Sequence, residues 1–491
     1  MKYIFCFLVA ITLAGSPINH ILMAQDASTA TKSDEKGDEK IDSMVKGYKG
    51  IAGQIIVAAR KQNDSYLKLQ ELCDDIGHRL SGSESLDKAI QWAQTSMKKD
   101  GHENVRAEKV MIRKWVRGNE SCELVLPRPM KIDMLGLGGS IGTPEEGITA
   151  EVIVVDDKEE LDGLSDEQVS GKIVVFNAAM PMFSEASGSG YGETVQYRSN
   201  GAKWAAERGG VAALVRSVTA YSLASPHTGA MRYDSTVKKV PTAAISVEAA
   251  MMLRRLQNRG KECSVKLSMQ AKDMGEAPSA NVIAEIVGSE KPEEIVLIGG
   301  HIDSWDVGQG AQDDGAGCVA AMEALNIIRK LGLKPKRTIR VVLWTNEENG
   351  LAGAKSYLAR HQEEIHVAGI ESDSGGFKPQ GLSIDMEDDL KEEVAVRQLS
   401  KILSLLDPAG ATRAKSSYSG ADVGQLKRLG TACMGLNVDG RLYFNTHHTW
   451  ADTVDKVNPK ELTDCAITLA VTAFVFADMP GRLGDDVTKG E

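Results

Sequence analysis

A chain of 491 residues is too long for one ordinary globular unit, so its length favours two domains with terminal extensions. With 42% hydrophobic and 25% charged residues, its composition excludes a wholly disordered, collagen-like or repeat-built protein. The formal net charge of -11 argues against nucleic acid or an anionic membrane as a partner and favours a small-molecule or peptide substrate.

The N-terminus has the layout of a secretory signal peptide. Lys2 precedes an apolar run, Tyr3 to Ala14, which is too short to span a bilayer comfortably and is followed by small and polar residues. We therefore predict a signal peptide over residues 1–24, with its cleavage site left open, and a secreted or periplasmic protein without a stable membrane anchor. A buried N-terminal helix is disfavoured because the next residues are too polar to pack against it. Residues 25–48 are charged and poor in apolar side chains, which predicts a disordered leader.

The rest of the chain changes its hydrophobic pattern twice. Helical spacing dominates from Ile51 to about residue 100. Between about 140 and 273 the pattern consists of short apolar runs separated by loops, with two helical segments. From Ser279 onward strands and helices alternate, and runs such as IVLIGG and IRVVLWT are apolar throughout, as strands covered on both faces must be.

These patterns predict an α/β protein with a doubly wound, mixed but mostly parallel sheet and an inserted smaller α/β domain. The main domain is expected to comprise residues 49–139 and 274–480. The insert is expected at 140–273, and residues 481–491 form a short tail.

Polar residues follow several predicted strands of the main domain, at the edge where open α/β sheets bind ligands. Taken alone, each has an ordinary explanation, such as a helix cap for Asp313 or a core position for His301. Their recurrence at successive strand ends is harder to explain without a shared site. In chain order these residues are His301, Asp303, Asp313, Glu347, Glu348, Asp373 and His448.

This set has the chemistry of a two-metal site. Two divalent ions need several hard or borderline ligands and one carboxylate that bridges them. Two Zn²⁺ ions carry four positive charges, which three ligand carboxylates and one hydroxide would balance. Glu347 is then not needed as a ligand and is free to act as general base on the attacking water. Asp303 is expected to hold the second ring nitrogen of His301.

The segments around these residues resemble the co-catalytic zinc aminopeptidase family, most closely its carboxypeptidase Q branch. The resemblance rests on GGHIDSWDVGQGAQDDGAG, VVLWTNEENGLAGA, ESDSGG and HHTWADT. It runs from about residue 50 to about residue 480, because TVQYRSNGAKWAAERGGVAALVRSV and SPHTGAMRYD are similar to the protease-associated insert of that branch.

The resemblance implies a role for each site residue. One zinc would be bound by His301 and Asp373, the other by Glu348 and His448, with Asp313 as the bridge. Glu347 would be the base. The aligned ligand is His448 and not His447, because His448 stands four residues before Asp452. The peptide bond between Asp313 and Asp314 is expected to be cis.

The implied activity is that of a two-zinc exopeptidase acting on unblocked dipeptides or short peptides. One alternative is an aminopeptidase of the same family that acts on longer peptides. The other, a non-catalytic binding protein on this fold, is disfavoured because all five ligands and the base are present. The resemblance is also compatible with a homodimer. Substrate preference stays open, since residues 414–430 depart from the family pattern, and Tyr443 is either an oxyanion donor or a packed aromatic.

Overall fold

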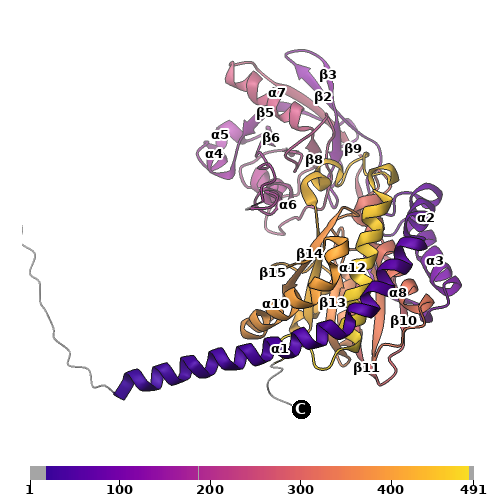
Figure 1. Cartoon of the computed structure of the whole chain (residues 1–491). Helices are drawn as coiled ribbons and strands as arrows, with labels where there is room; N and C mark the ends of the chain where they lie inside the picture. The colour runs from indigo at the N-terminus through magenta and orange to yellow at the C-terminus, as the bar shows by residue number, and fades with distance from the viewer. Residues whose placement is uncertain (1–17, 186, 486–491) are drawn as a thin grey trace, which may run out of the picture.

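The computed structural model describes residues 18–185 and 187–485. It contains two α/β units, each built on an eight-stranded sheet, and Figure 1 shows the smaller unit standing above the larger one. The apolar run of the predicted signal peptide, residues 3–14, lies outside the described residues. Within the described ranges, no helix combines the length and the apolar character that crossing a membrane requires.

A long helix, α1 (Ile18–Lys61), runs through the segment for which a disordered leader was predicted, so that prediction was wrong. Ile41, Val45 and Tyr48 recur at helical spacing and are buried against the core of the larger unit. The Tyr48 hydroxyl also donates a hydrogen bond to Asp478, at 2.9 Å. The segment is highly charged overall, but a few apolar residues at helical spacing are sufficient to pack the helix against the core.

The larger unit is built on a mixed sheet with the strand order β1-β10-β12-β11-β13-β16-β14-β15. Four of its seven pairings are parallel, which confirms the predicted mixed, mostly parallel sheet. The strands are β1 (Glu103–Val116), β10 (Lys272–Ile286), β11 (Lys291–His301), β12 (Arg337–Trp344), β13 (Ile365–Glu371), β14 (Pro379–Asp385), β15 (Arg413–Ser416) and β16 (Ala432–Val438).

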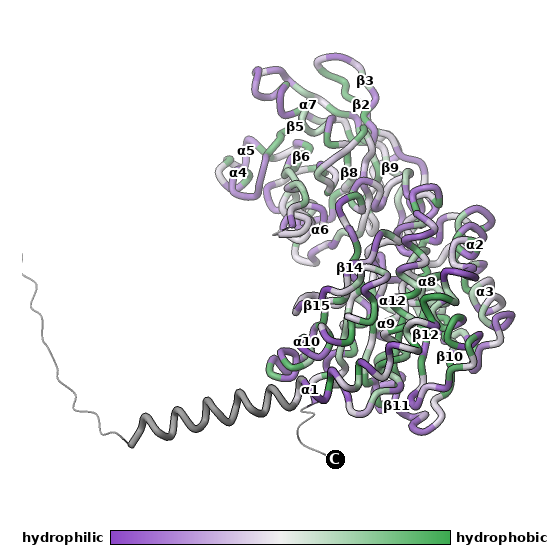
Figure 2. The backbone as a smooth tube through the Cα atoms, viewed as in Figure 1, coloured by the Kyte–Doolittle hydropathy of each residue, from purple (hydrophilic) through white to green (hydrophobic). Residues whose placement is uncertain are grey.

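Helices cover both faces of this sheet, as doubly wound packing requires. In the fully buried strand β12, Val341 and Leu343 point into the core formed with α1, α3, α8, α10 and α12, whereas Val342 and Trp344 pack on the opposite side against α9. Figure 2 shows apolar stretches gathered around α8 and β12. The helices of this unit besides α1 are α2 (Ser65–Gln70), α3 (Glu84–Lys99), α8 (Ala316–Lys330), α9 (Ala352–His361), α10 (Asp389–Leu403), α11 (Tyr443–Thr446) and α12 (Pro459–Asp478).

The smaller unit has its own sheet, in the order β3-β2-β9-β5-β6-β7-β8-β4. Its strands are β2 (Glu120–Leu126), β3 (Met130–Ile132), β4 (Met134–Gly136), β5 (Ile148–Val155), β6 (Ile173–Phe176), β7 (Ala212–Arg216), β8 (Thr242–Ile245) and β9 (Ser264–Met269). Its helices are α4 (Lys158–Asp162), α5 (Asp166–Val169), α6 (Tyr191–Glu207) and α7 (Val247–Asn258).

The second sheet therefore begins at Glu120, about twenty residues before the predicted insert boundary at 140. The short strands β2, β3 and β4 precede that boundary, and nothing in their local sequence tells which sheet they join. The long strands β1 and β10 of the larger sheet pair with each other and lead into and out of the smaller unit. The two units are thus connected by a pair of hydrogen-bonded strands.

Candidate metal centre

The residues predicted as metal ligands converge at one edge of the larger sheet. β11, β12 and β13 are parallel neighbours, so their carboxyl ends meet at that edge. His301 is the last residue of β11, and Asp373 follows β13. Glu347 and Glu348 come shortly after β12, and Asp313 stands just ahead of α8. Strand ends that are far apart in the chain therefore place these side chains in one region.

Asp313 lies at the centre of the cluster, and its two oxygens face different histidines. Asp313 Oδ1 lies 3.1 Å from His301 Nε2, and Oδ2 lies 3.1 Å from His448 Nε2. A second carboxylate accompanies each histidine: Asp373 Oδ1 is 3.5 Å from His301 Nε2, and Glu348 Oε2 is 3.1 Å from His448 Nε2. The side chains thus form two ligand sets that share one carboxylate.

Main-chain carbonyls orient both imidazole rings. His301 Nδ1 donates to the carbonyl of Asp303 at 2.9 Å, and His448 Nδ1 donates to the carbonyl of Thr228, in the smaller unit, at 3.1 Å. Because a carbonyl can only accept, both rings carry their proton on Nδ1. Each Nε2 faces Asp313, so its lone pair would be directed as a metal ligand requires once a bound ion displaces any proton there.

The structure corrects the role expected for the side chain of Asp303. Its carboxylate Oδ1 lies 3.9 Å from His301 Nδ1, so the carbonyl rather than the carboxylate holds the ring. The carboxylate instead accepts hydrogen bonds from the Glu347 N–H at 3.1 Å and from the Ser81 hydroxyl at 3.0 Å. Asp303 therefore fixes the backbone at Glu347 as well as the ring of His301.

Two further buried acids fix the turn that carries Asp313. The Asp452 carboxylate accepts from the N–H groups of Gln312 and Asp313, at 2.7 and 3.2 Å. The Asp314 carboxylate accepts from the N–H of His301 at 3.0 Å. The Asp313–Asp314 peptide bond is cis, which confirms the expectation drawn from the family resemblance.

The buried carboxylates and histidines perturb one another strongly. Burial raises the pKa of Glu348 to about 7, and repulsion from Asp313 adds to the effect. Burial also raises the pKa of Glu347 well above its usual range, with Asp373 contributing to the shift. Burial favours the neutral form of His448, but Glu348 and Asp313 outweigh it and raise the pKa of His448 to about 10. A divalent cation would relieve the repulsion between these carboxylates.

Two oxygens of the cluster are buried without a hydrogen-bond donor among the described residues: Asp313 Oδ2 and Glu348 Oε1. An unpaired buried acceptor costs about 1–3 kcal/mol, and a bound cation would supply the missing partner. Imidazole nitrogens and carboxylate oxygens together are a donor set that zinc uses. The residues present therefore fit a metal ion.

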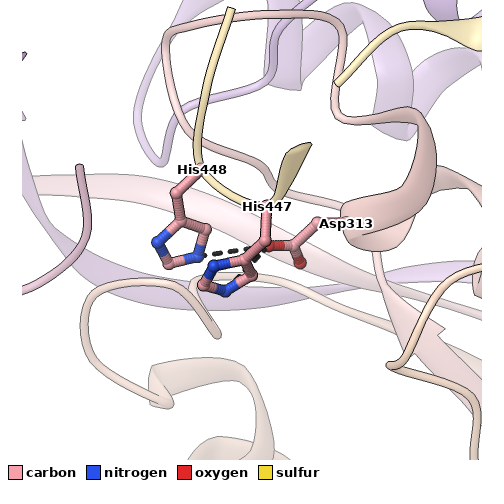
Figure 3. Close-up of side chains that lie close together, drawn as sticks. All are labelled: Asp313, His447 and His448. Carbon is pink, nitrogen blue, oxygen red and sulfur yellow. Dashed lines mark ion pairs between the residues drawn. The ribbon is translucent and has the colours of Figure 1, made fainter. Parts of the chain in front are cut away.

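His447 also reaches the site, which the sequence motif did not indicate. Figure 3 shows His447 and His448 side by side, with the Asp313 carboxylate next to them. Their rings are stacked with centroids 3.5 Å apart. His447 Nε2 lies 3.6 Å from Asp313 Oδ2, farther than His448 Nε2, which also lies next to Glu348. The geometry thus favours His448 as the ligand and places His447 at the wall of the site.

A cavity of about 840 Å³ opens onto the cluster and is lined by both units. The larger unit contributes Glu347 and Tyr443, and helix α6 of the smaller unit contributes Tyr191 and Arg198. The Tyr443 ring lies 5.1 Å from the ring of His447. Arg198 and Thr228 stand in the two segments that resemble the protease-associated insert, but nothing in those segments indicates a place in the site, because both residues reach it only through the packing of one unit on the other.

Comparisons with known proteins agree on one family. The model of peptidase family M28 matches residues 281–473. Carboxypeptidase Q of Mus musculus is 43% identical over 449 residues, covering 90% of this chain and 93% of the relative. The crystal structure of a peptidase M28 precursor from Shewanella amazonensis aligns with a TM-score of 0.84 at 35% identity, covering 89% of this chain and 98% of that chain. The chain therefore belongs to peptidase family M28 and is a metallo-exopeptidase.

Proposed function

We propose that this protein is a two-zinc exopeptidase that hydrolyses unblocked dipeptides or short peptides. The observation that carries the proposal is the position of Asp313, whose two oxygens each lie 3.1 Å from a different histidine. A carboxylate placed in this way is suited to bridge two ions. The printed names of similar proteins support zinc and exopeptidase chemistry, since they include carboxypeptidase Q and a zinc aminopeptidase from Bacillus subtilis.

In this proposal each ion has its own histidine and its own carboxylate. His301 and Asp373 would hold one zinc, and His448 and Glu348 would hold the other, with Asp313 available to both. The assignment follows the two ligand sets, because each histidine lies against a different oxygen of Asp313 and against its own second carboxylate. His447 is left outside the ligand set.

Bound zinc would supply Lewis acidity, which lowers the pKa of water and polarises the scissile carbonyl. Glu347 takes the proton from the attacking water and returns it to the leaving amine. Its position suits this role, because Glu347 lines the cavity and its backbone N–H is held by Asp303 at 3.1 Å. Tyr443 lines the same cavity and is proposed as a hydrogen-bond donor to the developing oxyanion.

A substrate panel combined with metal analysis tests the proposal. Free dipeptides should be cleaved faster than their N-acetylated forms, and active protein should contain about two zinc ions per chain. Efficient removal of N-terminal residues from long peptides would instead show an aminopeptidase. One ion or none in fully active protein would reject the two-zinc site, and the absence of hydrolysis with both ions bound would reject the peptidase function.

The proposal includes export from the cytoplasm, because the apolar run from Tyr3 to Ala14 lies between Lys2 and a polar stretch. Protein recovered from the periplasm or the medium should be shortened at its N-terminus. Intact-mass measurement checks this, and an exported protein that still carries Met1 would contradict it.

A further inference from the structure

The histidine assigned to one of the two proposed zinc ions is held by the smaller unit. The Thr228 N–H donates to the carbonyl of His448 at 3.0 Å, and His448 Nδ1 donates to the carbonyl of Thr228 at 3.1 Å. His448 also has a φ of 62°, in the left-handed region that residues other than glycine rarely adopt. A backbone in this conformation persists only where its surroundings hold it. The position of His448 therefore depends on the position of Thr228.

The side chain of Thr228 is held in turn by Arg117, which stands where the chain passes from β1 to β2 and is only 8% exposed. Arg117 Nη2 donates to Thr228 Oγ1 at 3.3 Å, and Arg117 Nη1 donates to the carbonyl of Gly136, the last residue of β4. Thr228 Oγ1 donates to the same carbonyl at 2.7 Å. Arg117, Gly136 and Thr228 thus form one connected set of hydrogen bonds.

The other edge of the Arg117 guanidinium binds the larger unit. Nε and Nη2 donate to the two carboxylate oxygens of Asp306 at 2.9 and 2.5 Å, which is a bidentate pair. The two side chains are only 9% and 16% exposed, so water competes little for this contact. Asp306 stands in the segment that follows His301 at the end of β11. Arg117 therefore joins the edge of the larger sheet to the residue that holds His448.

We propose that Arg117 is a positioning residue for His448 and sets the zinc affinity of the ligand set that contains this histidine. The inference rests on the proposed two-zinc function and adds a residue outside both ligand sets. Without Arg117, the side chain of Thr228 loses its link to the larger unit, so His448 Nε2 would be held less firmly near Asp313 Oδ2. Because the outer partners of a metal-binding histidine tune its affinity for the ion, binding should weaken at this ligand set.

The ligand set that contains His301 does not share this dependence. The ring of His301 is held by the carbonyl of Asp303, which belongs to the same unit. The Asp303 carboxylate is itself fixed by the Ser81 hydroxyl and the Glu347 N–H. The two proposed ions should therefore respond differently to the loss of Arg117, whereas a general loss of stability would weaken both.

The test measures zinc binding to the full-length protein, first stripped of metal by chelation and then titrated in competition with a chelator of known affinity. The wild type should bind two ions. Arg117→Met should weaken one of them by about 10-fold, at the low end of the effect of an outer partner of a ligating histidine, and leave the other unchanged. Activity should recover when free zinc is raised. Arg117→Lys should restore part of the affinity, since it keeps the charge but not the fork.

Two further variants sharpen the test. Arg113→Met is the matched control, because Arg113 lies on the same strand and pairs with Asp273 at 2.8 Å, but its side chain is 68% exposed. It should keep both zinc affinities of the wild type. Thr228→Val removes the acceptor for Arg117 but keeps the main-chain carbonyl that holds His448. Its effect should not add to that of Arg117→Met, since both substitutions break the same link.

The other outcomes would overturn the inference. Equal weakening of both ions in Arg117→Met would show a general effect on the fold, and unchanged affinities would show no role at all. Additive effects of Arg117→Met and Thr228→Val would show that Arg117 does not act through Thr228. If Arg117→Met does not fold, unchanged zinc affinities in both Arg117→Lys and Thr228→Val reject the inference. A wild type that binds one ion or none would reject the proposed two-zinc function, and the inference with it.

Discussion

The two units of the molecule contribute to one cavity in different ways. The larger unit supplies the proposed zinc ligands, which follow neighbouring parallel strands and stand in recognisable motifs. The smaller unit supplies Arg198 and the carbonyl of Thr228, whose local sequence does not indicate that they reach the site. Side chains at strand ends can be located from the order of strands, because the sheet dictates where they meet. A wall formed by packing one unit on another has no such local signature.

The largest effect is expected at Asp313, the carboxylate that the two ligand sets of the larger unit share. Asp313→Ala should lose both ions and all measurable activity, because its two oxygens face both histidines. His448→Ala should loosen mainly one ion. Metal content per chain, measured on samples whose fold is checked by circular dichroism, separates the two variants. Equal metal loss in both would contradict the shared role of Asp313.

A second test separates two neighbouring glutamates of the larger unit. Glu347→Gln keeps the size of the side chain but cannot accept a proton, so kcat should fall by at least roughly 10²–10⁴-fold while both ions stay bound. Glu348→Gln should reduce metal content and activity together, because Glu348 lies against His448. Steady-state kinetics and metal analysis on the same samples decide the matter. If Glu347→Gln sheds zinc and Glu348→Gln does not, Glu347 is the ligand and Glu348 the base, the reverse of the proposed assignment.

The contribution of the smaller unit can be tested where it touches the larger one. A Cβ atom at Gly138 would lie 2.0 Å from Trp305 Cη2, and the Trp305 ring lies 5.6 Å from the ring of His448. Gly138→Ala should therefore cost about 1–3 kcal/mol of stability through overpacking and lower activity as well. Gly192→Ala, in the same unit, has no atom within 4 Å of the new Cβ and is the matched control.

Chemical denaturation and kinetics of both glycine variants measure the effect. Gly192→Ala is expected to stay within about 0.5 kcal/mol of the wild type. If Gly138→Ala likewise changes neither stability nor activity, the packing between the units does not position the site. The different contributions of the two units to the cavity would then lack a physical basis.

The smallest expected effect concerns a charge pair in the larger unit that the sequence did not reveal. Glu108 on β1 accepts a hydrogen bond from His361 on α9, at 2.8 Å. Burial opposes ionisation of Glu108, but His361 and Arg106 together outweigh it and lower the pKa of Glu108 to about 2. Burial likewise lowers the pKa of His361, but Glu108 and Glu364 raise it above the usual 6.5.

The signs of these shifts define a pH window. The contribution of Glu108 is present above pH 4.5 and is lost as the pH falls toward 2. That of His361 is complete below pH 6.5 and is lost as the pH rises through its raised pKa. Glu108→Gln should therefore be least stable relative to the wild type between pH 4.5 and 6.5, by about 1–2 kcal/mol. A difference in unfolding free energy that does not vary with pH would contradict the pairing.

Most of the fold was predictable, and the exceptions share a physical cause. Apolar runs such as IRVVLWT identify buried strands wherever they pack, so the main sheet followed from sequence. Helix α1 was missed because only a few residues, such as Ile41 and Val45, dock it among many charged neighbours. The start of the second sheet at Glu120 was missed because strand pairing over long separations is not encoded locally. The place of Arg198 in the cavity wall was missed for the same reason, since it depends on where α6 packs.

The paired strands β1 and β10 that connect the units have a mechanical consequence. They are paired from Glu103 to Val116 along β1, with irregularities between Glu103 and Arg106 and between Lys114 and Trp115. A ribbon of this kind resists extension and twisting far more than a single-chain linker of equal length, because every displacement strains a ladder of hydrogen bonds. The smaller unit is therefore joined to the larger one by a connection that is stiffer than a single-chain linker, which restricts how far the two walls of the cavity can separate.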